Sequence, residues 1–332
     1  MSPPDPSHQP RPNPVSQGDS NRKKSGLSLK TAIRLGIAVV VVAAVIYTLL
    51  GSVQSFRQRK FDFSSVEYRW WILAVFSYII TMFCSSVFWH QILIAFRQRP
   101  IFGRSLLAFY ASQLGKYVPG KAMVVVIRTD LIRGPKVKVG PAAASVFVET
   151  LSWIFTGSLV GGVLIVWLYP DQWWLKLTAG SMALFSGILT LPPVFNSVAS
   201  FVISRKKVAV DLDGLGFATM FRGWGILTLG WIFNGLSLWL ILKGMPGIEV
   251  RGDDFWLTLA SVSLATSAGF ISLLPGGLGV RELVMIPLLG ARFDPATAVL
   301  AAVIIRLVWL IAELLTSGNI FLIRWLKFRS SR

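Results

Sequence analysis

Long apolar runs dominate the pattern of hydrophobic and polar positions along the chain. A helix needs about 20 apolar residues to cross a hydrocarbon core about 30 Å thick. Tryptophan or tyrosine lies near the ends of most runs of this length, where an interfacial belt would place it. The runs predict six membrane-spanning helices, at residues 32–50, 71–96, 141–168, 173–195, 224–242 and 297–323.

Two further apolar stretches, residues 105–132 and 255–292, are interrupted near their centres by proline and glycine. Non-helical backbone inside a bilayer requires protein or water to satisfy its N–H and C=O groups. We therefore predict that each stretch is a re-entrant hairpin, and that the second stretch consists of two short apolar halves. The residues expected to shape the hairpin tips are Gly115, Pro119, Gly120, Pro275, Gly276, Gly277 and Gly279. The predicted fold class is all-α, a polytopic integral membrane protein with about six spanning helices and two broken hairpins.

Composition supports this class and excludes others. The 332 residues are 54% apolar and 14% charged, whereas soluble domains are about 45–50% apolar and about 25% charged. The only cysteine, Cys84, excludes a disulfide-stapled scaffold. A net charge of +18 would suggest nucleic acid in a soluble protein. Here the basic residues flank apolar runs, as topology signals do, so no nucleic-acid partner is expected.

Charge and proline also divide the chain into domains. Residues 1–30 hold six prolines in the first fourteen positions and a basic cluster, which predicts a disordered cytoplasmic tail. Residues 31–325 form the predicted transmembrane domain, and 326–332 a second basic cytoplasmic tail. Treating both broken stretches as hairpins places most flanking basic residues on one side of the membrane. This favours a multi-pass protein of the plasma (inner) membrane with both termini cytoplasmic.

The two interrupted stretches carry the candidate chemistry. The first break includes Lys116 and Lys121, and the second is followed by Arg281 at the start of a helix. Backbone donors, the positive end of a half-helix and a cation together suit a phosphate or another anion. The alternative is that each Pro-Gly pair marks a plain turn whose cations extend to an interface.

These motifs resemble the lysylphosphatidylglycerol synthase transmembrane region, also called the flippase-like domain family, over about residues 30–325. The most specific part is Pro275–Glu282. The segment Gly115–Lys121 is similar to the family's Gly-Arg/Lys-aromatic-x-Pro-Gly element, and Arg128 stands in place of its downstream arginine. Glu149 fits the family's membrane glutamate, although Thr150 and Trp153 replace the arginine and aspartate that usually follow.

The resemblance implies a translocator for an aminoacylated lipid. The chain ends at Arg332, with no room for the aminoacyltransferase domain of full-length synthases, so lysyl transfer is not expected. The residues expected to bind the headgroup phosphate are Lys116, Lys121, Arg128 and Arg281.

Four further charges lie within or beside apolar helices, where an ionisable group is costly and usually faces a partner or a wet cavity. Glu149 and Glu313 are candidates for a proton-coupling carboxylate or for the counter-ion that releases a headgroup. Arg306 and Glu313 are seven residues apart and share a helix face, so a structural ion pair is the alternative for them. Glu282 could cap the half-helix that Arg281 opens.

The leading hypothesis is a lipid translocase or lipid-binding transporter that recognises an anionic phospholipid or a lipid-phosphate headgroup. A second hypothesis is an intramembrane transferase, or its accessory, acting on polyprenyl-phosphate or lipid-linked sugars. A third is a scaffold for an envelope lipid-modifying enzyme or glycosyltransferase. There is no Walker loop, and the only histidines are His8 and His90. We therefore predict no cofactor, metal or catalytic residue, and an anionic membrane lipid as the partner.

Overall fold

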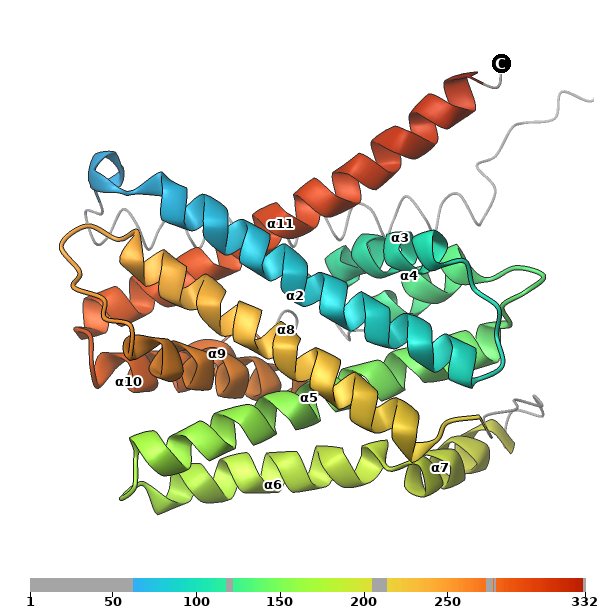
Figure 1. Cartoon of the computed structure of the whole chain (residues 1–332), viewed down its shortest axis with the longest axis horizontal. Helices are drawn as coiled ribbons and strands as arrows, with labels where there is room; N and C mark the ends of the chain where they lie inside the picture. Colours follow the sequence, from blue (N-terminus) through green and yellow to red (C-terminus); the bar gives the residue numbers. More distant parts are fainter. Residues whose placement is uncertain (1–61, 118–121, 205–213, 273–276, 278, 331–332) are drawn as a thin grey trace, which may run out of the picture. The chain divides into compact units, whose positions relative to one another are not determined.

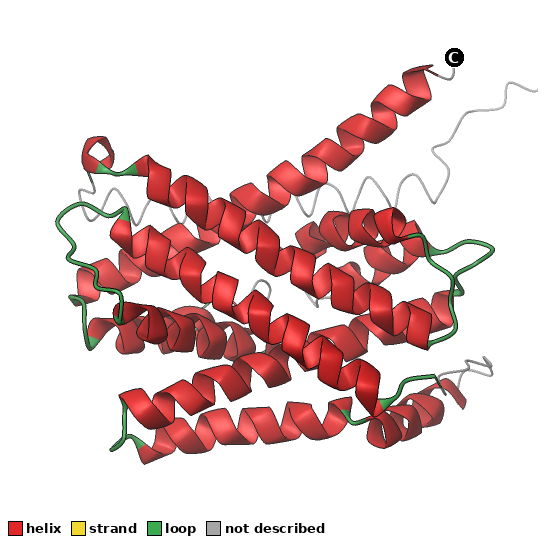
Figure 2. Ribbon diagram, viewed as in Figure 1, coloured by secondary structure: helices red, strands yellow, loops and turns green. Residues whose placement is uncertain are grey.

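The computed structural model describes residues 62–117, 122–204, 214–272, 277 and 279–330. All of them belong to the second of two units into which the chain divides, Val40–Arg332. Every regular element in these residues is a helix, and loops join the helices (Figure 2). The all-α class predicted from the apolar runs is confirmed.

In chain order, the helices are η1 (Phe63–Ser65), α2 (Tyr68–Ala95), α3 (Phe102–Gln113), η2 (Leu114–Tyr117), α4 (Ala122–Ile132), α5 (Val139–Leu168), α6 (Trp173–Thr190), α7 (Pro192–Ser204), α8 (Phe217–Lys243), α9 (Asp254–Ile271), α10 (Val280–Gly290) and α11 (Pro295–Ser330). The elements η1 and η2 are short 3-10 helices.

Five of these helices, α2, α5, α8, α9 and the part of α11 up to Gly318, are long and apolar enough to cross a membrane. A sixth candidate is the pair formed by α6 and the start of α7, which bends by 72°. The bend falls where Leu191, with an extended backbone (ψ 128°), precedes Pro192, because a residue before proline avoids the helical region. The chain is therefore a multi-pass membrane protein. The predicted span at 32–50 lies outside the described residues.

Both interrupted stretches fold as two helices that pack against each other, α3 with α4 and α9 with α10. The prediction of two short halves is wrong for the second stretch. Its first half, α9, has 18 residues and meets the length and hydropathy of a full span, because the apolar run continues unbroken to Ile271. Whether the stretches are re-entrant stays a prediction. Residues 118–121, 273–276 and 278 lie outside the described part, and with them Pro119, Gly120, Lys121, Pro275 and Gly276.

Small residues allow close packing around the middle of the bundle. Helix α2 packs along α8, and α5 contacts α6, α8 and α9 (Figure 1). A Cβ added to Gly157 on α5 would come within 2.4 Å of the Trp231 ring and 2.6 Å of Ser267 Oγ. Helix interfaces in membranes rely on such small residues, since lipid provides no hydrophobic drive to association. This packing brings α5 against α8 and α9.

The N-terminus of α11 carries a side-chain cap. Asp294 Oδ1 accepts hydrogen bonds from the backbone N–H of Ala296 (2.8 Å) and Thr297 (3.1 Å), and Oδ2 accepts one from the Thr297 hydroxyl. The hydrogen bonds from Thr297 hold the pKa of the Asp294 carboxyl below its usual value of 3.8. A proline directly after the cap, Pro295, fits the first helical position.

We expect Asp294→Ala to lower the free energy of unfolding by about 1 kcal/mol at pH 7, because the cap is lost. A carboxyl with a depressed folded-state pKa stabilises above its unfolded value, and this contribution disappears as the pH falls through the folded value. The difference between wild type and variant should therefore vanish in strong acid. Unfolding of the detergent-solubilised protein measures it. Asp253→Ala is the matched control, since Asp253 occupies the same position on α9 without a side-chain cap, and an equal loss there would contradict the prediction.

Candidate functional site

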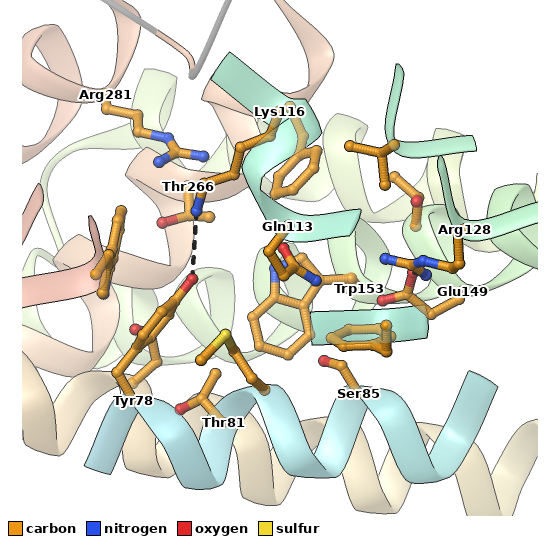
Figure 3. Close-up of a pocket in the computed structure, with 17 residues that line it drawn as sticks. Tyr78, Thr81, Ser85, Gln113, Lys116, Arg128, Glu149, Trp153, Thr266 and Arg281 are labelled. Atoms are coloured by element: carbon orange, nitrogen blue, oxygen red, sulfur yellow. Dashed lines mark hydrogen bonds and ion pairs between the residues drawn. The ribbon is translucent and has the colours of Figure 1, made fainter. Parts of the chain in front are cut away.

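A polar cavity of about 80 Å³ lies in the bundle, lined by residues from both helix pairs and from α2, α5, α8 and α11. Three of the four predicted headgroup residues line it: Lys116 from η2, Arg128 from α4 and Arg281 from α10. Figure 3 shows Lys116 and Arg281 on one side of this cavity and Arg128 with Glu149 on the other. The fourth residue, Lys121, lies outside the described residues. We call this space the polar cavity.

A close approach of backbones places Lys116. A Cβ on Gly115 would come within 2.9 Å of the Val124 backbone nitrogen, so η2 contacts α4 as closely as only glycine allows. The hairpin-shaping role predicted for Gly115 stays a prediction, because Pro119 and Gly120 lie outside the described residues. The contact holds the following residue, Lys116, over the polar cavity.

Arg128 forms a buried ion pair with Glu149. Its Nη1 lies 2.9 Å from Glu149 Oε2, and its Nε donates to Ser112 Oγ at 2.9 Å. The two side chains are 2% and 8% exposed, and the guanidinium lies 4.2 Å from the centre of the Phe109 ring. Glu149 of α5 thus already balances the charge of Arg128. Glu149 forms this ion pair although Thr150 and Trp153 replace the arginine and aspartate that usually follow it in the family.

Lys116 pairs with the fully buried Glu313 of α11. Both the Lys116 ammonium and the Tyr78 hydroxyl donate to Glu313 Oε1, and Lys116 Nζ lies 3.4 Å from the Tyr78 oxygen. The second carboxylate oxygen of Glu313 has no hydrogen-bond partner among the described residues. Lys116 and Glu313 are 197 residues apart in sequence, so this pair ties η2 to α11.

Arg306 of α11 forms the third ion pair, with Glu282 of α10, at 2.6 Å. Arg306 and Glu313, considered above as one structural pair, do not pair with each other. Each binds an opposite charge on another element, and together they join α11 to both interrupted stretches. Glu282 lies in the first turn of α10, where the positive end of the helix dipole stabilises a carboxylate.

Arg281 is the exception among these cations. It is 7% exposed, and among the residues that the structure describes its Nε has no hydrogen-bond partner and no acidic side chain forms an ion pair with it. Its guanidinium carbon lies 5.1 Å from the centre of the Trp309 ring and 5.8 Å from that of Phe270. Lys116 and Arg128, which line the cavity with Arg281, are each paired with a carboxylate, and the Arg306–Glu282 pair lines a smaller pocket that Arg281 also lines. Among the described residues this leaves Arg281 as one unbalanced positive charge.

Two glycines make room for the Arg281 side chain. A Cβ on Gly269 would lie 2.7 Å from Arg281 Cγ, and one on Gly277 would lie 2.8 Å from Arg281 Nε. Gly277 also has a left-handed backbone (φ +68°), which favours glycine. Gly277 was predicted as a hairpin residue, and Gly269 was missed. Gly279, also predicted, has φ +80° and is the N-cap of α10.

Sequence reasoning also missed the aromatic and neutral polar lining. Trp309 stacks on Tyr78 at 5.4 Å, and the Lys116 ammonium lies 5.9 Å from the Trp309 ring centre. Thr266 Oγ1 and Asn234 Oδ1, both from lining residues, have no hydrogen-bond partner in the part of the chain that the structure describes. Tyr78 and Trp309 lie in the middle of apolar runs rather than at their ends, and that position was the available signal.

No cluster of three or more histidine, cysteine, aspartate or glutamate side chains that could hold a metal ion occurs in the described part of the chain. The polar groups of the cavity are instead three cations, the paired carboxylate of Glu149, a tyrosine and amide or hydroxyl groups. This set suits an anion better than a cation.

The sequence model described as the lysylphosphatidylglycerol synthase TM region matches residues 33–316. The chain belongs to this family. The match contains both interrupted stretches, Glu149 and the α11 residues Arg306 and Glu313. Membership in the lysylphosphatidylglycerol synthase transmembrane-region family connects the chain with membrane lipids. A comparison with curated proteins gave no match.

Proposed function

We propose that this protein is a membrane lipid translocase, or a lipid-binding transporter, whose polar cavity binds the phosphate of an anionic headgroup. The observation that carries this function is Arg281, a buried guanidinium at the cavity without an acidic partner in the described chain. A buried charge is costly unless it is paired and hydrogen-bonded. An anionic ligand would supply the missing partner.

The chemistry of the site favours phosphate among anions. A guanidinium offers donors in a fixed planar fork that matches phosphate oxygens. Arg281 lies at the second position of α10, so the N-terminal backbone groups and the helix dipole favour the same negative charge. Lys116, paired with Glu313, lines the same cavity as Arg281.

The position of the cavity between the two helix pairs supports transport of the headgroup. Helices α3 and α4 form one wall and α9 and α10 another. If the pairs enter from opposite leaflets, alternate movement of each would open the cavity to one side at a time. We place the protein in the plasma (inner) membrane with both termini cytoplasmic, as its basic residues favour.

The test compares wild type with Arg281→Gln in proteoliposomes, with transfer of a fluorescent anionic phospholipid between leaflets as the readout. Hydrogen bonds to a charged group contribute about 1.5–3 kcal/mol, so we expect transfer to slow roughly 10- to 100-fold. Arg251→Gln is the matched control, because Arg251 is exposed and pairs with Glu249 in the loop after α8. Wild-type transfer equal to that of empty vesicles, or equal rates in Arg281→Gln and wild type, would overturn the proposal.

A further inference from the structure

Among the described residues, the charges at the polar cavity and at the small pocket that Arg281 shares with Glu282 and Arg306 nearly cancel. Lys116 pairs with Glu313, Arg128 with Glu149, and Arg306 with Glu282, and Arg281 is the fourth cation. Glu282 is the most exposed of the three carboxylates, with a side chain 25% exposed. The described residues thus leave one positive charge for a ligand.

A single excess charge distinguishes between two kinds of phosphate. A phosphodiester carries one negative charge at neutral pH. A phosphomonoester carries about 1.5 to 2, because its second pKa is about 6. In a low-dielectric cavity Arg281 balances the first negative charge of either ligand. The described residues offer no further unpaired cation to balance a second negative charge.

Resting on the proposed function, we propose that Glu149, Glu282 and Glu313 are specificity determinants, which leave the described residues with one positive charge for the ligand. Each neutralises one cation that would otherwise be available to phosphate. The site consequently takes a phosphodiester in preference to a phosphomonoester. A polyprenyl-phosphate, which is a monoester, would be disfavoured on the same ground.

The same carboxylates also join helices, and that structural role alone predicts something different. If they only hold the helices together, replacing one of them by glutamine lowers the stability of the protein and weakens the binding of both kinds of ligand equally. If they set the charge, replacement adds one free cation and shifts the preference toward the monoester. Selectivity therefore separates the two roles, and stability does not.

The experiment measures binding of two short-chain lipids to the full-length protein in a neutral detergent at pH 8. The probes are dihexanoyl phosphatidylmethanol, a diester with one charge, and dihexanoyl phosphatidic acid, the corresponding monoester. We expect wild type to bind the diester at least about 10-fold more tightly. Glu282→Gln and Glu313→Gln should each shift this ratio at least about 10-fold toward phosphatidic acid. Dimethyl phosphate and inorganic phosphate, added as competitors, distinguish a lipid headgroup from free phosphate as the source of the anion.

Glu249→Gln is the control, since Glu249 is exposed, pairs with Arg251 and lies away from the cavity lining; its ratio should equal that of wild type. If Glu313→Gln does not fold, Glu282→Gln decides the result. Equal binding of both probes, lost in Arg281→Gln, would overturn the charge proposal and leave the proposed function standing. If Arg281→Gln binds both probes as well as wild type does, both proposals fall.

Discussion

Replacing Arg128 by methionine is expected to lower the free energy of unfolding by about 3–5 kcal/mol. The variant leaves Glu149 buried without its cation, and breaking a buried ion pair on one side costs about that much. It also removes the hydrogen bond to Ser112 and the contact with the Phe109 ring. Chemical or thermal unfolding of the detergent-solubilised protein, followed by tryptophan fluorescence, measures the loss.

The double variant Arg128→Met with Glu149→Leu should regain most of this loss, because no uncompensated charge then stays buried. Arg133→Met is the matched control near the end of the same helix. Arg133 pairs with Asp130 where both side chains are exposed, and such pairs contribute about 0–1 kcal/mol. A double variant at least as unstable as the single one would contradict the prediction. The expected result assigns Arg128 to the framework of the site.

The spanning helices could be predicted from sequence because hydropathy sums over some twenty residues and tolerates single exceptions. The interrupted stretches could be recognised from Pro275, Gly277 and their neighbours. The length of α9 was misjudged, since proline and glycine mark where a helix stops and give no information on where it starts. The hydropathy of Asp254–Ile271 was sufficient for a full span.

The pairing of the charges could not be predicted. Each ion pair joins two elements, and Lys116 and Glu313 lie 197 residues apart, so sequence spacing says nothing about their contact. Spacing alone suggested instead that Arg306 and Glu313 form a unit. The same reasoning could nominate Arg281 as a ligand-binding residue but could not single it out, because its distinction is that no acidic residue in the described part of the chain forms an ion pair with it.

The second large effect is expected from the glycines beside Arg281. Gly277→Ala should weaken binding of a short-chain anionic phospholipid at least about 10-fold. The new methyl group would lie 2.8 Å from Arg281 Nε and 3.0 Å from the Gly269 Cα, so the guanidinium must move. Gly269→Ala should act in the same way, because its methyl group would lie 2.7 Å from Arg281 Cγ. Titration calorimetry on the full-length protein measures both.

Backbone strain must be separated from displacement of the guanidinium. Gly277 has φ +68°, which costs an alanine about 1–2 kcal/mol. Gly247→Ala is the matched control, since Gly247 has φ +71° and a Cβ there would meet no atom within 4 Å. It should lower stability by a similar amount and leave lipid affinity unchanged. Gly269→Ala carries the displacement without a left-handed backbone. Loss of affinity in Gly277→Ala and Gly269→Ala but not in Gly247→Ala would therefore trace the effect to Arg281. If all three variants bind the lipid as tightly as wild type does, Arg281 is not part of the binding site.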